Sequence, residues 1–285
     1  MAGWLACMAV MVIAGRETTR ALSVFQVMEL RSLIGFVMLW PLIHRAGGVR
    51  AMRTAHPGWQ LVRNVAHYAA QCCWLAALTL IPIAQVVSIE FTMPIWIAIL
   101  AVSFLGEHMG LWKNVAVGLG LVGVVVIVRP FGGEVGTGQL IALAASVGFA
   151  VSVIVVKALT RTDRVIVILF WMVAIQSVLG LVPALLVWRW PTPEVWGWLV
   201  VVAFCGTYSH YCMTRALLHA DATVVVPMDF LRVPLAALVG WWVYGERVDL
   251  LTAVGAGLIL VGNLLNLKAA ERPGGKWRPG KTGKP

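Results

Sequence analysis

The chain has 285 residues, of which 60% are hydrophobic and only 12% are charged. Soluble domains carry roughly 25% charged residues, so this composition argues against a soluble protein and favours an integral membrane protein in a lipid bilayer. A net charge of +10 can indicate a nucleic-acid partner. The basic residues, however, lie mostly in short loops and in the C-terminal tail, so we expect no nucleic acid to bind.

Ten apolar stretches follow one another along the chain, each near the ~20 residues that a helix needs to cross a bilayer. They cover residues 2–21, 23–43, 60–80, 83–105, 111–129, 137–158, 164–188, 195–217, 222–244 and 250–267. Because lipid offers the backbone no hydrogen bonds, these stretches predict an all-α membrane protein with ten transmembrane helices. Two interpretations of the first stretch stay open, since its clean apolar part ends at Gly15: it continues to about Leu22, or the native chain begins upstream.

Basic residues are distributed unevenly between the loops. Alternate loops and the tail hold fifteen of the 22 Lys and Arg residues, with Arg63 counted among them, the opposite loops hold five, and two lie inside spans. The positive-inside rule then places both termini in the cytoplasm, in a protein of the bacterial inner membrane. Residues 268–285 are rich in Gly, Pro and Lys and predict a disordered basic tail.

The motifs of several enzyme classes do not occur in the sequence. The five cysteines form neither a CxxC nor a Cys/His metal spacing, and GxxxxGK[ST], HExxH and GxSxG are missing. The GxGxxG match at residues 118–123 lies inside an apolar stretch with no preceding strand, so it does not indicate a dinucleotide site. We therefore expect no catalytic residues, no metal and no cofactor.

Residues 225–262 repeat residues 86–123 without a gap, at an offset of 139. Each copy keeps an acid within apolar sequence, Glu90 in the first and Asp229 in the second. Five spans per copy is an odd number, so the second copy enters the membrane from the opposite side. We expect one five-helix repeat over residues 1–131 and a second, inverted one over residues 132–267, around a central cavity.

Five charged residues fall at or near the middle of predicted spans: Glu29, Arg31, Glu90, Asp229 and Arg232. Such a charge costs roughly 2.5–3.5 kcal/mol at a helix centre on insertion scales, so these side chains must face a cavity or pair with each other. Asp229 and Arg232 lie three residues apart and can pair on one helix face. Ion pairing that only locks the bundle is the alternative to a functional role.

Pro94 and Pro234 lie soon after the two acids. Proline bends or breaks a helix, and a broken helix near the membrane centre exposes backbone groups to a ligand. A simple packing kink is the alternative. Glycines 118, 120 and 123 in the fifth span, and 255, 257 and 262 in the tenth, predict close helix packing.

Two predicted helices carry a polar stripe on one face. The stripes are Asn64, His67, Gln71 and Trp74 in the third span, and Thr207, His210, Tyr211 and Thr214 in the eighth. Such stripes suit an amphiphilic organic solute, and hydrogen bonding between helices is the alternative for the histidines. The candidate cavity residues are His67, Tyr68, Gln71, Trp74, Glu90, Trp96, His210, Tyr211, Thr214, Asp229 and Arg232, and the candidate coupling residues are Glu90 and Asp229.

A family resemblance rests on Gly106-Glu107 and Gly245-Glu246, each followed by a Gly-rich span. With Ala216-Leu217 through Ala222-Thr223 and the Val-Pro-Met-Asp-Phe stretch before Pro234, the chain resembles the drug/metabolite transporter superfamily, EamA-domain type. The resemblance implies a 5+5 inverted repeat with a cavity lined largely by helices one, three, four, six, eight and nine. Glu107 and Glu246 fall at span ends, where we expect each to cap the next helix.

The expected function is secondary-active transport of a small organic metabolite, such as an amino acid or a nucleotide-like or vitamin-like solute. Alternating access with proton coupling or exchange is the expected mechanism, in a monomer or weak homodimer. Two alternatives belong to other classes. A membrane-embedded transferase would need a donor site that these short loops do not offer, and a channel-like permease would show flux that does not saturate.

Overall fold

The computed structural model describes residues 2–93, 95–97, 99–100, 111–128, 136–160, 162–219, 232–247 and 249–270. Its helices are α1 (Ala2–Ala21), α2 (Val24–Arg45), the short 3-10 helix η1 (Val49–Met52), α3 (Pro57–Leu80), α4 (Ile83–Glu90), α6 (Leu111–Val128), α7 (Thr137–Leu159), α8 (Val165–Leu186), α9 (Pro193–His219), α11 (Arg232–Tyr244) and α12 (Leu250–Ala270). No strand occurs in these ranges, so the predicted all-α fold class is confirmed.

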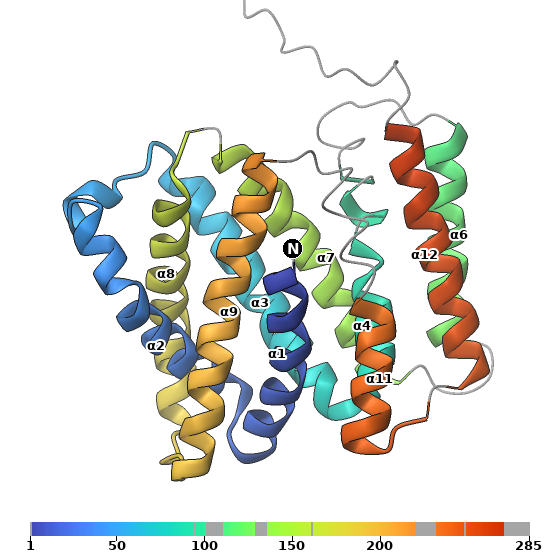
Figure 1. The fold of residues 1–285 in the computed structure, drawn as a ribbon, viewed down its shortest axis with the longest axis horizontal. Coiled ribbons are helices and arrows are strands. Elements are labelled where there is room, and N and C mark those ends of the chain that lie inside the picture. The colour runs from blue at the N-terminus through green and yellow to red at the C-terminus, as the bar shows by residue number, and fades with distance from the viewer. Residues whose placement is uncertain are drawn as a thin grey trace, which may run out of the picture.

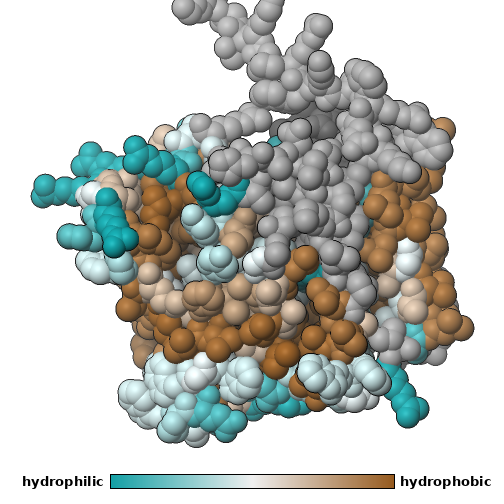
Figure 2. All heavy atoms as spheres, in the orientation of Figure 1, coloured by the Kyte–Doolittle hydropathy of each residue, from teal (hydrophilic) through white to brown (hydrophobic). Residues whose placement is uncertain are grey.

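Three of these helices, α2, α7 and α8, are long and apolar enough to cross a membrane by length and composition. Shorter apolar helical stretches cover Val117–Ile127, Leu235–Tyr244 and Leu250–Leu265. The surface agrees with a membrane protein. Figure 2 shows hydrophobic residues across the middle of the molecule, with paler and more hydrophilic residues along the lower edge and at the upper left.

Helix α3 is long but carries several polar residues, and its surroundings explain why it tolerates them. It contacts α1, α2, α4, α7 and α8, so much of its surface faces protein. Polar side chains within a membrane protein are stable where they face such an interior. The polar stripe predicted for this segment therefore lies on an enclosed helix.

The helices pair across the two halves of the chain. α1 packs on α9, α2 on α8, α3 on α7, α4 on α11, and α6 on α12. In Figure 1, α6 and α12 stand side by side at the right edge, while α1, α2, α8 and α9 gather at the left. Each of these contacts joins a helix of residues 1–131 to a helix of residues 132–267.

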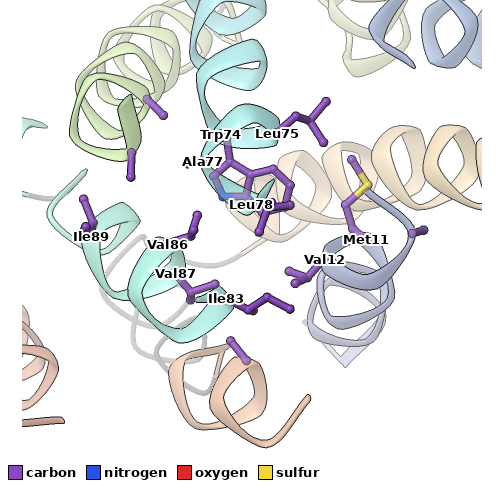
Figure 3. Packing of buried hydrophobic residues seen from close by; sticks show 14 of the residues in the cluster. Met11, Val12, Trp74, Leu75, Ala77, Leu78, Ile83, Val86, Val87 and Ile89 are labelled. Atoms are coloured by element: carbon purple, nitrogen blue, oxygen red, sulfur yellow. The ribbon is translucent and has the colours of Figure 1, made fainter. Parts of the chain in front are cut away.

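The main hydrophobic cluster fills the space where α1, α3 and α4 meet (Figure 3). Leu75, Leu78 and Ile83 are completely buried there. Figure 3 shows the Trp74 ring lying among these side chains, with Met11 of α1 nearby. Close packing of this kind fixes α3 against α4 and sets the position of the polar groups at their contact.

The packing of α6 on α12 depends on two glycines at the point of closest approach. A β-carbon on Gly123 would lie 2.7 Å from the Gly255 carbonyl oxygen, and a β-carbon on Gly255 would lie 2.7 Å from the Gly123 carbonyl oxygen. The predicted packing role is confirmed for these two residues. Gly118 and Gly257 differ, because a β-carbon on either would meet no described atom within 4 Å.

The helix predicted over residues 83–105 is interrupted after Glu90. α4 ends at Glu90, and Phe91 and Thr92 form a turn. Pro94 lies outside the described residues, but proline has no N–H to donate to the carbonyl four residues earlier, which here is that of Glu90. Asn263 Nδ2 of α12 donates to the Phe91 carbonyl at 2.8 Å. The break expected beside the acid is therefore present, and Glu90 lies at a helix end.

Candidate functional site

Glu90 and Arg232 form a buried ion pair between α4 and α11. Arg232 Nη2 lies 3.0 Å from Glu90 Oε1 and 2.9 Å from Oε2, and the two side chains are only 6% (Arg232) and 12% (Glu90) exposed. Trp74 of α3 donates from Nε1 to Glu90 Oε2 at 2.9 Å. The guanidinium also lies 5.7 Å from the ring centroid of Trp4. The carboxylate is thus held by α3 and α11 together, while Asp229 lies outside the described residues.

His67 of α3 and His210 of α9 meet edge to face, with 4.9 Å between their ring centroids. The Phe149 ring of α7 lies 5.5 Å from that of His67. His67 Nε2 is buried and has no hydrogen-bond partner among the described residues. The histidines of the two predicted polar stripes, in the third and eighth spans, therefore contact each other in space.

The polar stripe of α3 points inwards and links the histidine pair to Glu90. Asn64, His67, Gln71 and Trp74 are all buried. Asn64 Nδ2 donates to the Trp171 carbonyl of α8 at 3.3 Å, whereas Gln71 Oε1 has no partner in the described part of the chain. The helix rises about 15 Å over these ten residues. One face of α3 therefore carries polar groups across much of the bundle.

Two buried arginines lie at the start of this polar face. Arg31 of α2 donates from Nη2 to Gln176 Oε1 of α8 at 2.9 Å, and Arg63 donates from Nη1 to Asn64 Oδ1 at 2.5 Å. Counting Arg63 as a loop residue was wrong, since it lies inside α3. The sequence could have indicated this, because Arg63 falls within the predicted span at 60–80. Gln176 was not predicted, although it is a single amide within an apolar stretch.

Glu29 of α2 and Tyr68 of α3 share a narrow space next to α8. A β-carbon on Gly180 would lie 2.6 Å from Glu29 Oε2 and 3.1 Å from the Tyr68 hydroxyl. Both oxygens are buried without a partner among the described residues. A buried polar atom without a partner costs about 1–3 kcal/mol. Several such atoms around α3 therefore indicate a place where water or a solute binds.

The remaining predicted residues lie around this centre. Trp96 donates from Nε1 to Thr92 Oγ1 at 3.0 Å, and Thr214 Oγ1 donates to the His210 carbonyl at 2.7 Å. Tyr211 is 40% exposed and lines an open cavity of about 470 Å³ between α2, α8 and α9. The stacked rings of Phe204 and Tyr208 lie in the same wall. The family resemblance implied a cavity lined by predicted spans one, three, four, six, eight and nine. The cavity seen here is lined by α2, α8 and α9, which are the second, seventh and eighth spans, so only α9 belongs to both sets.

Glu246 caps a helix of the opposite half, and the expectation that it caps the next helix is wrong. Its Oε2 accepts a hydrogen bond of 2.9 Å from the backbone N–H of Ile83, the first residue of α4. Its Oε1 pairs with Arg16 of α1. Gly245 has a φ of +63°, which glycine adopts without strain, and it turns the chain after α11. The Gly-Glu pair thus ties α11 to α4 and α1, while Glu107 lies outside the described residues.

Apolar helices that enclose buried charges and polar stripes define an α-helical integral membrane protein with a polar interior. The model of the EamA-like transporter family matches the chain twice, at residues 2–129 and 136–268. The chain belongs to this family, as the Gly-Glu signatures and the repeat predicted. The family and the relatives below are transporters, so the enzyme alternative has no support from them.

The relatives cover most of the chain. A riboflavin transporter of Rhizobium johnstonii is 30% identical over 244 residues, which cover 84% of this chain and 80% of the relative. An S-adenosylmethionine uptake transporter of Rickettsia bellii is 24% identical, covering 87% and 85%. A pseudopaline exporter of Pseudomonas aeruginosa is 26% identical, covering 86% and 87%. One solved crystal structure shares the fold, with a TM-score of 0.66 and 20% identity over 95% of this chain and 97% of the other.

Proposed function

We propose that the chain is a secondary-active transporter that moves a small organic metabolite across the bacterial inner membrane by alternating access. The Glu90–Arg232 pair carries the proposal, because it joins the two halves inside apolar helices and lies on the polar face of α3. Charged groups in such positions mark solute and ion pathways. Relatives named for riboflavin, S-adenosylmethionine and pseudopaline support a metabolite as the cargo.

The helix contacts support two inverted repeats over residues 1–131 and 132–267. Let α1, α2, α3, α4 and α6 correspond to α7, α8, α9, α11 and α12. If the halves are related by symmetry, the contact of α3 with α7 must have a counterpart between α9 and α1. The contact of α2 with α9 must likewise have a counterpart between α8 and α3. All four contacts occur. In carriers of this design, exchanging the conformations of the halves moves the opening from one side of the membrane to the other.

The two ends of the bundle differ in a way that supports an inward-facing state. Where α1 ends and α4 begins, Arg16, Glu246 and the Ile83 backbone hold three helices together. The open cavity reaches the other end of the bundle, where it is lined by Ala46 at the C-terminal end of α2 and Ile166 at the N-terminal end of α8. With both termini in the cytoplasm by the positive-inside rule, the closed end faces outwards.

Glu90 and Asp229 are the coupling acids in this proposal. Protonation of Glu90 removes the charge that holds Arg232, so the contact between α4 and α11 weakens when a proton binds. Coupling follows if solute binding and proton binding favour different states of this contact. Asp229 is included because the repeat gives both halves an acid at the same position.

A counterflow assay tests the proposal. Purified protein in liposomes preloaded with unlabelled riboflavin or S-adenosylmethionine should accumulate the labelled solute faster than empty vesicles, and the flux should saturate. Glu90→Gln should lose most of this flux, while Glu194→Gln, at an exposed acid of α9, should keep it. Flux that neither saturates nor responds to counter-solute would support the channel alternative. Wild-type flux in Glu90→Gln would remove the coupling role.

A further inference from the structure

We infer that the transported solute carries an anionic group, a carboxylate or a phosphate, which binds between Arg31 and Arg63 beside His67. The inference rests on the proposed transport function and names the chemistry of the cargo. It follows from buried cations and hydrogen-bond donors for which the described protein provides no acceptor.

Arg31 and Arg63 are buried cations with neutral partners. They are 4% and 3% exposed, and among the residues that the structure describes they donate to the side-chain oxygens of Gln176 and Asn64 alone. Neither takes part in a salt bridge within the described residues. Both side chains lie against α8, Arg31 through Gln176 and Arg63 through Asn64, whose amide also donates to the Trp171 carbonyl. Burial costs several kcal/mol per ion, so a counter-charge at this place is strongly stabilising.

Glu29, the nearest acid along the chain, does not supply that counter-charge. Residues two apart on a helix do not face each other, so Glu29 and Arg31 point away from one another on α2. The Glu29 carboxylate instead faces Gly180 and the Tyr68 hydroxyl. Within the described ranges, the two arginines therefore have no acidic partner.

The unpartnered atoms around the arginines include three donors. Arg31 Nη1, Arg63 Nε and Gln176 Nε2 are buried and have no acceptor in the described part of the chain. A carboxylate or phosphate places several acceptor lone pairs on one compact group, and arginine binds such groups with two parallel hydrogen bonds. Gly206 of α9 allows Arg31 to approach this helix closely, since a β-carbon there would lie 3.1 Å from Nη1.

The polar face of α3 suits the rest of such a solute. One turn after Arg63 lies His67, whose ring meets those of His210 and Phe149. One turn further, Gln71 Oε1 is a buried acceptor without a donor among the described residues. A ring that packs on the histidines and presents an N–H to Gln71 fits this sequence of contacts. The solute class is therefore a heteroaromatic acid or a phosphorylated ring compound.

Anion binding can be measured without knowing the cargo. The purified full-length protein in detergent is titrated with inorganic phosphate or acetate, against chloride at constant ionic strength, while its thermal unfolding is followed. We expect a saturable rise in the melting temperature, because a ligand of the folded state stabilises it. Arg31→Gln and Arg63→Gln should weaken the apparent affinity at least tenfold. Arg215→Gln, at an exposed arginine of α9, should behave like wild type.

Arg31→Lys separates loss of binding from loss of folding, since it keeps the charge and should recover part of the rise. No rise in the wild type, or an equal rise in the Gln variants, would overturn the inference. In the counterflow assay described above, riboflavin 5′-phosphate should inhibit uptake of the labelled solute better than riboflavin does. Nicotinate should likewise inhibit it better than nicotinamide. If the wild-type protein shows saturable flux without a preference for the anionic inhibitors, the anion inference is wrong and the proposed transport function stands. If the wild-type protein shows no saturable flux, the proposed function itself is contradicted.

Discussion

The carboxylate of Glu246 accepts a hydrogen bond from the backbone N–H of Ile83, although 163 residues separate them along the chain. The first N–H groups of a helix have no partner within it, and an anion at this end also interacts favourably with the helix dipole. The turn that follows α11 therefore supplies the cap at the start of α4. Arg16 binds the other oxygen of the same carboxylate, which brings α1 into the contact.

Replacing Glu246 should open this end of the bundle. Glu246→Ala removes the cap of α4 and leaves Arg16 without its partner, so we expect a loss of about 1–3 kcal/mol. Glu246→Gln keeps an acceptor for Ile83 and should lose less. Thermal unfolding in detergent measures both, with Glu194→Gln as the exposed control. Equal stability of Glu246→Ala and wild type would contradict the capping role.

The close approach of α6 and α12 should not tolerate a methyl group. Gly123→Ala places a β-carbon 2.7 Å from both the Gly255 carbonyl oxygen and Ile259 Cγ1, so the helices must separate. Overpacking of this kind costs roughly 1–3 kcal/mol. Gly257→Ala is the matched control, because no described atom lies within 4 Å of its β-carbon. Should both variants unfold at the same temperature, the glycine contact does not hold these helices.

The Glu90–Arg232 pair should show strong coupling in a double-mutant cycle. Loss of either partner breaks a buried, hydrogen-bonded ion pair, which destabilises the folded state, whereas removal of both charges costs less. We expect Glu90→Gln and Arg232→Gln each to lower the melting temperature, and the double variant to recover part of the loss. Additive effects of the two substitutions would show that the pair is not coupled.

Asn263 should matter for the break after α4. Asn263→Leu removes the donor to the Phe91 carbonyl and leaves a buried acceptor unsatisfied, at a cost of about 1–3 kcal/mol. We expect a lower melting temperature and reduced counterflow, because Phe91 directly follows Glu90. Asn114→Leu, on the exposed face of α6, changes the same side chain without such a bond and serves as control. Unchanged stability and flux in Asn263→Leu would argue against this role.

The sequence predicted the parts of this molecule that depend on periodicity. The apolar stretches predicted helices, and the stripe with His67 and Trp74 predicted an inward-facing side of α3 because a helix repeats its faces every few residues. Partners across the fold were harder to predict. Glu246 was expected to act on the next helix, since nothing in a linear sequence shows that α4 begins beside it. Arg63 was misplaced because a charge count treats an arginine near a span end as a loop residue.

The end of α4 at Glu90 has an electrical consequence for Arg232. The free carbonyls at the C-terminal end of a helix act together like roughly half a negative elementary charge. Besides the carboxylate, Arg232 contacts the ring of Phe91, the residue that follows this helix end, with 5.6 Å between the guanidinium carbon and the ring centroid. Neutralising Glu90 therefore lowers the attraction between the helices, while the contact of Arg232 with the Phe91 ring remains. In the coupling role proposed for Glu90, binding of a proton thus weakens the contact between α4 and α11 without separating the two helices.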